Sequence, residues 1–279
     1  MLKNITAVTV ILAAGIIAGC GSSGSTAPST TSTISGKVAD GYLAGATVFL
    51  DKNGNYQLDA GEPFATTDAN GAYTLNVDTA DMGRYPIVAM ATKGVTIDKD
   101  TGVAVTNSYL LSMPKDSISG TVSSNFISPM SSQLREMMET GKYATVQQAM
   151  DALRLKLGMP GVNMLTDYML ANNTAMHTAA QNMASMMGSQ MPQIFVSSSS
   201  GTTVDVNRYR GMMGIIFSNL SSIKGAGSQT TMTSLMGTMT TTLTNMPMIN
   251  AGQPYRNMST AFSGGMMGGT AVAGAGGMM

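Results

Sequence analysis

One short stretch of the chain has the residue types of a site for a hard cation. Residues 51–62 read DKNGNYQLDAGE. A twelve-residue calcium loop offers oxygen ligands from positions 1, 3, 5, 7, 9 and 12. Here these positions are held by Asp51, Asn53, Asn55, Gln57 through its backbone carbonyl, Asp59 and Glu62. Three carboxylates in an all-oxygen set suit Ca²⁺ better than zinc, which prefers nitrogen and sulfur ligands.

A plain hairpin turn is the alternative for the same residues. Position 6 of the loop is Tyr56, where an EF-hand loop has glycine for its sharp turn. The flanking segments have the residue types of strands rather than helices. The pair Asn53-Gly54 is the strongest short signal for a two-residue hairpin. From the residues alone, a calcium loop and a hairpin turning at Asn53-Gly54 are both open.

The segments around the loop predict a small β-sandwich over residues 34–114. Short runs rich in β-branched and aromatic residues alternate with turn residues such as Asp40-Gly41 and Asn70-Gly71. In the run 72–77, Tyr73, Leu75 and Val77 alternate with polar residues and should face the core. The expected strands are residues 34–38, 46–50, 72–77, 85–92 and 107–113.

The sequence GKVADGYLAGATVFLDKNGNYQLDAGEPFATTDANGAYTLNV resembles the calcium-binding B-type repeats of bacterial surface proteins and, more loosely, the carboxypeptidase regulatory-like domains. The resemblance rests on G-A-x-V-x-x-D at 45–51, on the loop, and on T-T-D-x-x-G-x-Y at 66–73, and it covers residues 34–113. It implies a prealbumin-like β-sandwich that acts as a spacer or ligand-binding module without catalysis. It also favours a structural calcium ion over the plain hairpin.

The first residues, MLKNITAVTVILAAGIIAGC, have the order of a secretory signal: a positive charge, an apolar run and small residues. Residues 17–20, with the chain's single cysteine, resemble the lipobox of bacterial lipoproteins. That resemblance implies a signal peptide over 1–19 and lipidation of Cys20, with the acyl chains anchoring the protein in a membrane. Because no Asp directly follows Cys20, the same resemblance implies retention in the outer membrane. Residues 20–33 have the composition of a flexible linker.

Helical signals dominate residues 115–250. Ser128-Pro129 is a helix start and Gly141 a stop, while Thr145 begins a second helix that ends at Gly158. This part of the chain resembles helical segments that follow β-modules in bacterial surface lipoproteins, in the order Ser-Pro, helix, Gly, helix, Leu-Gly, Asp. No activity is established for those segments. The expected helices are residues 129–140, 145–157, 166–187, 203–223 and 230–245. The fold class is therefore α+β and multidomain, with a β-sandwich followed by a methionine-rich helical domain.

Methionine is concentrated in this second part, with 24 of the 28 after residue 115. Its flexible side chain can replace leucine in a core, but thioethers also bind Cu(I) or Ag(I). The helical groups that could do so are Met183/Met186/Met187/Met191 and Met232/Met236/Met239. The best candidates for exposed ligands are Met266, Met267, Met278 and Met279, in the Gly/Met-rich tail at 251–279.

Enzymatic chemistry is not expected. His177 is the only histidine, and Cys20 is the only thiol. The pair Glu136/Glu139 lies one turn apart on a helix and is interpreted as a solvated face. Fifteen basic residues balance fifteen acidic ones, so no basic surface for nucleic acid is expected. The sequence predicts a lipid-anchored module of the cell envelope that binds a partner protein or a second copy, with a copper-binding or silver-binding lipoprotein as the alternative.

Overall fold

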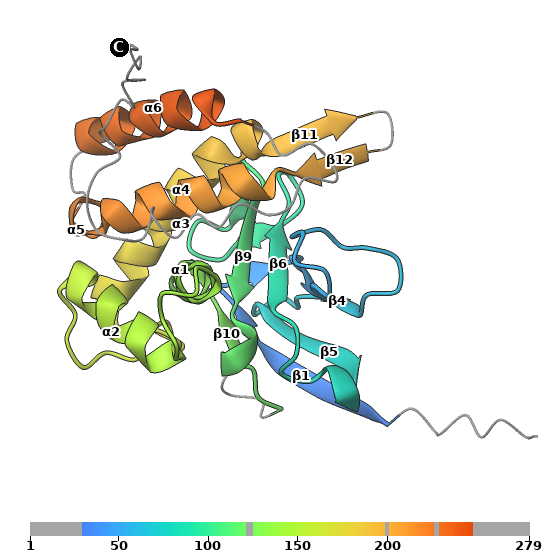
Figure 1. The fold of residues 1–279 in the computed structure, drawn as a ribbon. Coiled ribbons are helices and arrows are strands. Elements are labelled where there is room, and N and C mark those ends of the chain that lie inside the picture. The colour runs from blue at the N-terminus through green and yellow to red at the C-terminus, as the bar shows by residue number, and fades with distance from the viewer. Residues whose placement is uncertain (1–29, 121–124, 199–200, 226–228, 248–279) are drawn as a thin grey trace, which may run out of the picture.

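Most of the strands lie in the first half of the chain and most of the helices in the second. A computed structural model describes residues 30–120, 125–198, 201–225 and 229–247 (Figure 1). The strands are β1 (Thr31–Val38), β2 (Leu43–Ala44), β3 (Thr47–Leu50), β4 (Phe64–Thr66), β5 (Ala72–Asp78), β6 (Ile87–Ala91), β7 (Ile97–Asp98), β8 (Val103–Ala104), β9 (Tyr109–Met113), β10 (Asn125–Ile127), β11 (Phe195–Ser198) and β12 (Gly201–Val204). The helices are α1 (Pro129–Glu139), α2 (Val146–Leu157), α3 (Thr174–Ile194), α4 (Val206–Ser218), α5 (Leu220–Ile223) and α6 (Gln229–Asn245), with short 3₁₀ turns at Thr79–Asp81 and Lys115–Ser117. The chain is thus of the predicted α+β class.

The β part contains two larger sheets. One has the strand order β4-β3-β6-β9 and is antiparallel throughout, and the other has the order β10-β1-β5. The five expected strands all form, and Tyr73, Leu75 and Val77 of β5 are buried on one face as predicted. β1 begins at Thr31, inside the segment expected to be a linker, because Thr31 to Thr33 pair with the end of β5. The small sheet β2-β7-β8 and the hairpin β11-β12 are additions that the sequence did not predict.

The first two helices begin and end where the sequence predicts. Ser128 caps α1 by accepting a hydrogen bond from the Ser131 N–H, and Pro129 occupies the first turn. Thr145 caps α2 in the same way, and Gly158 ends it in the left-handed conformation with φ 62°. Both pairs of signals satisfy backbone groups that a helix leaves unpaired at its ends. The predicted helix at 230–245 also forms, as α6.

The third helix was expected at 166–187 and instead runs from Thr174 to Ile194. Its cap is Asn173, whose side chain accepts a hydrogen bond from the Met176 N–H. The preceding segment is held in turns because the Tyr168 hydroxyl donates to the backbone carbonyls of Ala39 and Asp40. The fourth predicted helix, at 203–223, is divided: its first residues belong to β12, and α4 and α5 follow.

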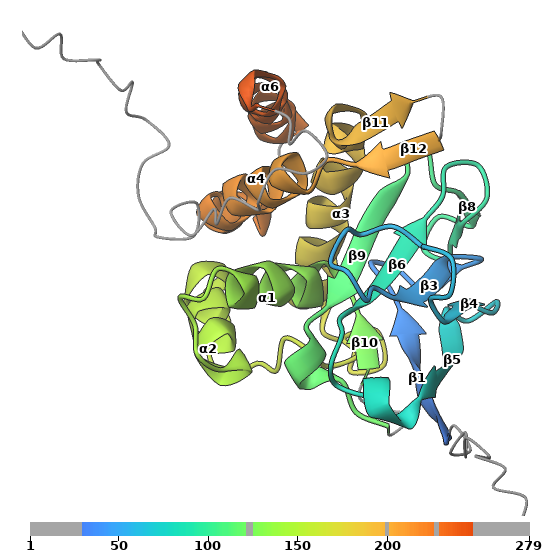
Figure 2. The ribbon, with the colours of Figure 1, turned by 45° about the vertical axis from the view of Figure 1, so that its right-hand side comes forward.

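The helices gather on one side of the sheets (Figure 1), and the turned view shows α1 and α3 beside β9 (Figure 2). β10 lies beyond the domain boundary expected at residue 114, yet it pairs in parallel with β1 of the β part, Gly36 opposite Asn125. The buried apolar residues of both parts form one continuous cluster. The boundary between residues 34–114 and 115–250 therefore does not separate two cores. None of the described helices is long and apolar enough to cross a membrane.

Candidate functional site

The loop at 51–62 connects β3 to β4, and its two ends are tied together. Phe49 pairs with Phe64, and the Leu50 N–H donates to the Pro63 carbonyl. A two-residue hairpin at Asn53-Gly54 would place Lys52 opposite Asn55 instead, so the hairpin alternative is wrong. All the predicted ligand positions lie within one loop between adjacent strands.

Asp51 organises the first half of this loop from a buried position. Its Oδ1 accepts hydrogen bonds from the N–H groups of Gly54 (2.8 Å) and Asn55 (3.1 Å). Its Oδ2 accepts from the Tyr56 N–H at 3.3 Å and from Nη2 of Arg135, on α1, at 2.8 Å. The side chains of both Asp51 and Arg135 are at most 1% exposed. This ion pair joins the loop to the helical part of the chain.

The remaining predicted side chains close the second half of the loop. Asn53 and Asn55 each donate an amide hydrogen bond to Oδ2 of Asp59, both at 2.7 Å. Glu62 accepts from the Lys52 N–H at 2.7 Å and from the Asp59 N–H at 3.0 Å. Gln57 donates its N–H to the Asn55 side chain at 2.8 Å. Four of the predicted side chains, those of Asn53, Asn55, Asp59 and Glu62, thus form one hydrogen-bonded group.

Tyr56 takes the backbone conformation that glycine usually supplies at this position. Its φ is 62°, in the left-handed region, where a non-glycine residue is strained and is held by its surroundings. The side chain is completely buried, with its ring centroid 3.9 Å from the Arg135 guanidinium and 4.5 Å from the Tyr209 ring. Its hydroxyl donates to Glu136. Tyr56 therefore makes the sharp turn expected of glycine while fixing the loop to α1 and α4.

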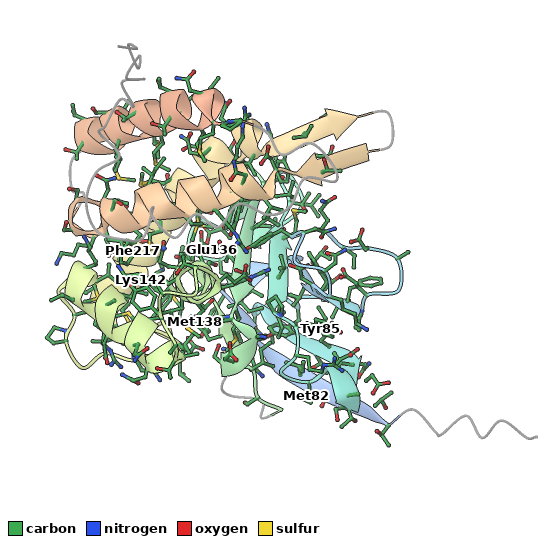
Figure 3. All side chains as sticks on the ribbon, viewed as in Figure 1. Met82, Tyr85, Glu136, Met138, Lys142 and Phe217 are labelled. Carbon is green, nitrogen blue, oxygen red and sulfur yellow. The ribbon has the colours of Figure 1, made fainter. Side chains whose placement is uncertain are left out.

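A buried network of charges lies beneath the loop. Arg135 contacts Glu139 at 2.9 Å, and Arg210 of α4 pairs with Glu139 and, at 3.3 Å, with Glu136. Figure 3 shows Glu136 where α1 meets α4. Burial, reinforced by the charge of Glu139, raises the pKa of Glu136 to about 7. Burial alone would lower the pKa of Arg135, but Tyr56, Glu139, Asp51 and Glu136 together raise it, so Arg135 stays charged.

The prediction that Glu136 and Glu139 form a solvated face is wrong for Glu136, which is 1% exposed. The prediction assumed that α1 buries a single face, whereas every residue from Pro129 to Met137 is buried. No local pattern indicates that Arg210 pairs with Glu136 or that Asp51 pairs with Arg135, because Arg210 and Asp51 lie far from α1 along the chain. A buried carboxylate requires such partners, and only the fold shows which residues they are.

The donor set fits a calcium ion only in part. The oxygen-bearing side chains of Asn53, Asn55, Asp59 and Glu62 lie together, and the backbone makes the required turn. Asp51, however, is fully engaged by backbone N–H groups and Arg135. Within the described parts of the chain, no three carboxylate, imidazole or thiol side chains come close enough together to hold a metal ion. Asn53 and Asn55 would have to turn their amide oxygens toward Asp59 for an ion to bind.

The candidate soft-metal residues are in the core where the structure describes them. Met183, Met186, Met187 and Met191 of α3 are all at most 1% exposed, and Met239 of α6 is fully buried. Met232 is 8% exposed, and Met236 is partly buried against the same core. These positions match the interpretation that methionine fills the core. Cys20, Met266, Met267, Met278 and Met279 lie outside the described residues.

The loop joins two parts of the fold through the ion pair of Asp51 with Arg135. The side chains of its acidic and asparagine residues form hydrogen bonds within the loop or with α1, and Lys52 pairs with Asp81 at 2.6 Å. His177, the other residue considered for catalysis, bonds through Nε2 to Oδ2 of Asp100 at 2.6 Å, and its ring stacks on Tyr168. Comparison of the chain with family models, with curated proteins and with solved structures finds no match.

Proposed function

We propose that this chain is a lipid-anchored structural module of the bacterial cell envelope. In this proposal a prealbumin-like β-sandwich, stabilised by calcium in the loop 51–62, carries a helical part that contacts a partner protein or a second copy. The observation that carries the proposal is the group formed by Asn53, Asn55, Asp59 and Glu62 in a loop fixed to α1. The role is structural because the loop joins two parts of one core.

The negative charge of the loop favours a bound cation, in addition to the oxygen atoms that could coordinate it. Asp59 accepts from two side-chain amides and Glu62 from two backbone N–H groups, and no lysine or arginine of the described residues pairs with either carboxylate. Lys52 of the loop pairs with Asp81 outside it, and Arg135 pairs with Asp51. An asparagine amide that turns over exchanges its nitrogen and oxygen positions, so Asn53 and Asn55 can offer oxygen where they now offer N–H. A calcium ion bound there would replace hydrogen bonds to Asp59 with stronger contacts.

Two exposed leucines support a contact surface on the helical part. Leu155 of α2 is 83% exposed and Leu170, in the turns before α3, is 75% exposed. In this proposal these two side chains are the apolar residues that the contact buries. Substituting both with lysine should leave the fold intact and abolish any self-association that sedimentation of the full chain detects.

Calcium titration of the full chain tests the metal part of the proposal. Ligand binding stabilises the folded state by RT ln(1 + [L]/Kd), so a tenfold excess over Kd should raise the melting temperature by about 3–5 °C relative to chelator. The substitutions Asp59→Asn and Glu62→Gln should abolish this shift. Asp51→Ala is a poor test, because losing the partner of Arg135 destabilises the protein with or without calcium.

The matched control is Asp68→Asn. Asp68 also caps a turn, accepting hydrogen bonds from the N–H groups of Asn70 and Ala72, but it lies outside the loop. This variant should keep the full calcium shift. A wild-type melting temperature that is the same in calcium and in chelator would refute the calcium site.

The membrane anchor is tested separately on the full-length gene product. If Cys20 is lipidated, the protein should partition into the detergent phase, and the mass of its N-terminal peptide should show cleavage before Cys20 and added acyl chains. Cys20→Ser should leave the protein in the aqueous phase. An unmodified Cys20 in the wild type would contradict the anchor and leave the calcium result unaffected.

A further inference from the structure

A cavity of about 340 Å³ lies away from the calcium loop, between the end of β1, the segment from β7 to β9, and α3. Ligand pockets occupy about 300–1,000 Å³ and combine apolar walls with a few convergent polar groups. Val105, Tyr109 and Ala184 give this cavity apolar surface, and Asp40 and Asp98 give it carboxylates. Among the described residues that line it there is no lysine or arginine.

Asp40 is the unusual residue of this cavity because it is buried with one oxygen unpaired. The residue is 8% exposed. Its Oδ2 accepts a hydrogen bond from the Tyr109 hydroxyl at 2.8 Å, while Oδ1 accepts none from the described residues. Its backbone carbonyl is held by the Tyr168 hydroxyl at 3.2 Å. A buried acceptor without a donor is unfavourable, so a ligand that supplied a donor would be bound favourably.

The charges around Asp40 are negative. A Cβ placed at Gly41 would lie 2.6 Å from Oδ1 of Asp98 and 2.5 Å from Cγ of Asp100, so both carboxylates lie against that glycine. Asp100 is engaged by His177 and Gln181. Asp98 and Asp40 line the cavity, and Asp98 accepts hydrogen bonds from the Asp100 N–H and the Thr101 hydroxyl. Burial, and then the charges of Asp98 and Asp100, raise the pKa of Asp40 to about 7, although the Tyr109 hydrogen bond opposes the rise. The site lacks a positive charge.

We propose that this cavity binds a primary ammonium group on a short alkyl chain, with Asp40 as its counter-ion. The ammonium pairs with the carboxylate of Asp40, whose buried and unpaired Oδ1 turns toward the cavity to accept from it, and the alkyl chain lies against Val105, Tyr109 and Ala184. A metal ion is the poorer fit, because no three metal-binding side chains come together in the described parts of the chain. This site is independent of the calcium loop and of the lipid anchor.

Calorimetry on the full chain with 1-pentylamine tests the proposal, with 1-pentanol as the neutral probe of the same length. The wild type should bind the amine at least about tenfold more tightly than the alcohol, because a hydrogen bond to a charged group is worth more than a tenfold factor. Asp40→Asn should remove this preference. Equal binding of both probes by the wild type, or an unchanged amine affinity in Asp40→Asn, would overturn the proposal.

Two further variants separate loss of the site from loss of the fold. Ser185 is exposed at the rim of the cavity, so Ser185→Leu should fill the space, weaken amine binding and leave thermal unfolding unchanged. Asp151→Asn removes a carboxylate on α2, outside the cavity lining, and should bind the amine as the wild type does. Amine binding that survives Ser185→Leu at full affinity would place the ligand elsewhere and contradict the proposal.

The same ammonium chemistry can come from a free amine or from a lysine side chain of a partner. Titration with Nα-acetyl-lysine methylamide distinguishes these sources. Binding of both probes with loss in Asp40→Asn supports a cavity open to a lysine side chain, and binding of pentylamine alone supports a free small amine. Failure of both probes to bind overturns the proposal.

Discussion

Arg135 lies at the meeting point of the calcium-type loop and the helices. It is fully buried, pairs with Asp51 and Glu139, and stacks on Tyr56. The cation that balances Asp51 in this structure is therefore a side chain from another part of the chain. Oxygen donors could be recognised in the sequence because they repeat at fixed spacing within twelve residues. Arg135 could not be recognised as the partner of Asp51, because that pairing depends on where the fold places α1 relative to the loop.

The substitution Arg135→Met should be strongly destabilising. It keeps the length of the side chain but leaves Asp51 as a buried carboxylate without its counter-ion, which costs about 3–5 kcal/mol. Urea unfolding of the full chain measures the change in free energy. Arg84→Met is the control, because Arg84 is exposed and its loss should change stability by no more than about 0.5 kcal/mol. Equal effects of the two substitutions would contradict a buried ion pair.

Asp40 predicts how stability depends on pH. Its folded pKa of about 7 lies above the unfolded value of about 3.9, so between these values the folded state holds a proton that the unfolded state has released. Its contribution to stability is therefore full below pH 4 and is lost as the pH rises toward 7, with a slope of at most about 1.4 kcal/mol per pH unit. Asp40→Asn should reduce the slope, measured as the difference in unfolding free energy between pH 5 and pH 7, by the share of Asp40, while Glu136, whose pKa is also about 7, keeps its own share. An unchanged slope would show that Asp40 is ionised throughout.

At the scale of elements, local signals located the helices that begin with a clear cap. Ser128 with Pro129, and Thr145 with Gly158, gave α1 and α2 within a residue. The hydrophobic spacing predicts that the third helix starts at residue 166, whereas α3 starts after the cap at Asn173. β10 has only three residues and no periodicity of its own, so nothing in its sequence indicates that it pairs with β1.

The loop makes a prediction that depends on backbone conformation. Gly54 has φ 76°, whereas Gly237 lies within α6, and an added Cβ at either position meets no neighbouring atom within 4 Å. Gly54→Ala should therefore destabilise by about 1 kcal/mol, since alanine is strained in the left-handed region. Gly237→Ala should stabilise by about 0.5–1 kcal/mol, since alanine favours a helix. Thermal unfolding in chelator measures both, and a shared sign would contradict the loop geometry.

At the scale of the whole molecule, the division into a β domain and a helical domain describes the sequence better than the fold. β10 completes a sheet with β1, α1 and α3 cover β9, and the Tyr209 hydroxyl of α4 donates to the Leu110 carbonyl. The change in composition after residue 114 is real, but composition does not show where a core ends. Contacts between distant residues decide that, and the sequence contains no local signal for them.

Residues 30–114 produced alone should therefore fail to fold stably. Without β10 the strand β1 has a free edge, without α1 the strand β9 loses its cover, and Asp51 loses Arg135. Free strand edges and uncovered apolar surface favour aggregation. We expect an aggregated or unfolded product by circular dichroism and sedimentation, with residues 30–247 as the folded control. A cooperative melt of the shorter chain would show that the β part is independent.

The buried methionines of the core can be oxidised only when the protein unfolds. Met130, Met137, Met176 and Met213 are fully buried, so an oxidant reaches their sulfur atoms only when the core opens. Conversion to the sulfoxide makes the side chain polar and incompatible with repacking. In peroxide without a methionine sulfoxide reductase, each opening event would therefore leave an oxidised side chain. The oxidation rate of these residues would then report how often the core opens. Oxidised molecules could not refold, so the amount of folded protein would fall with time.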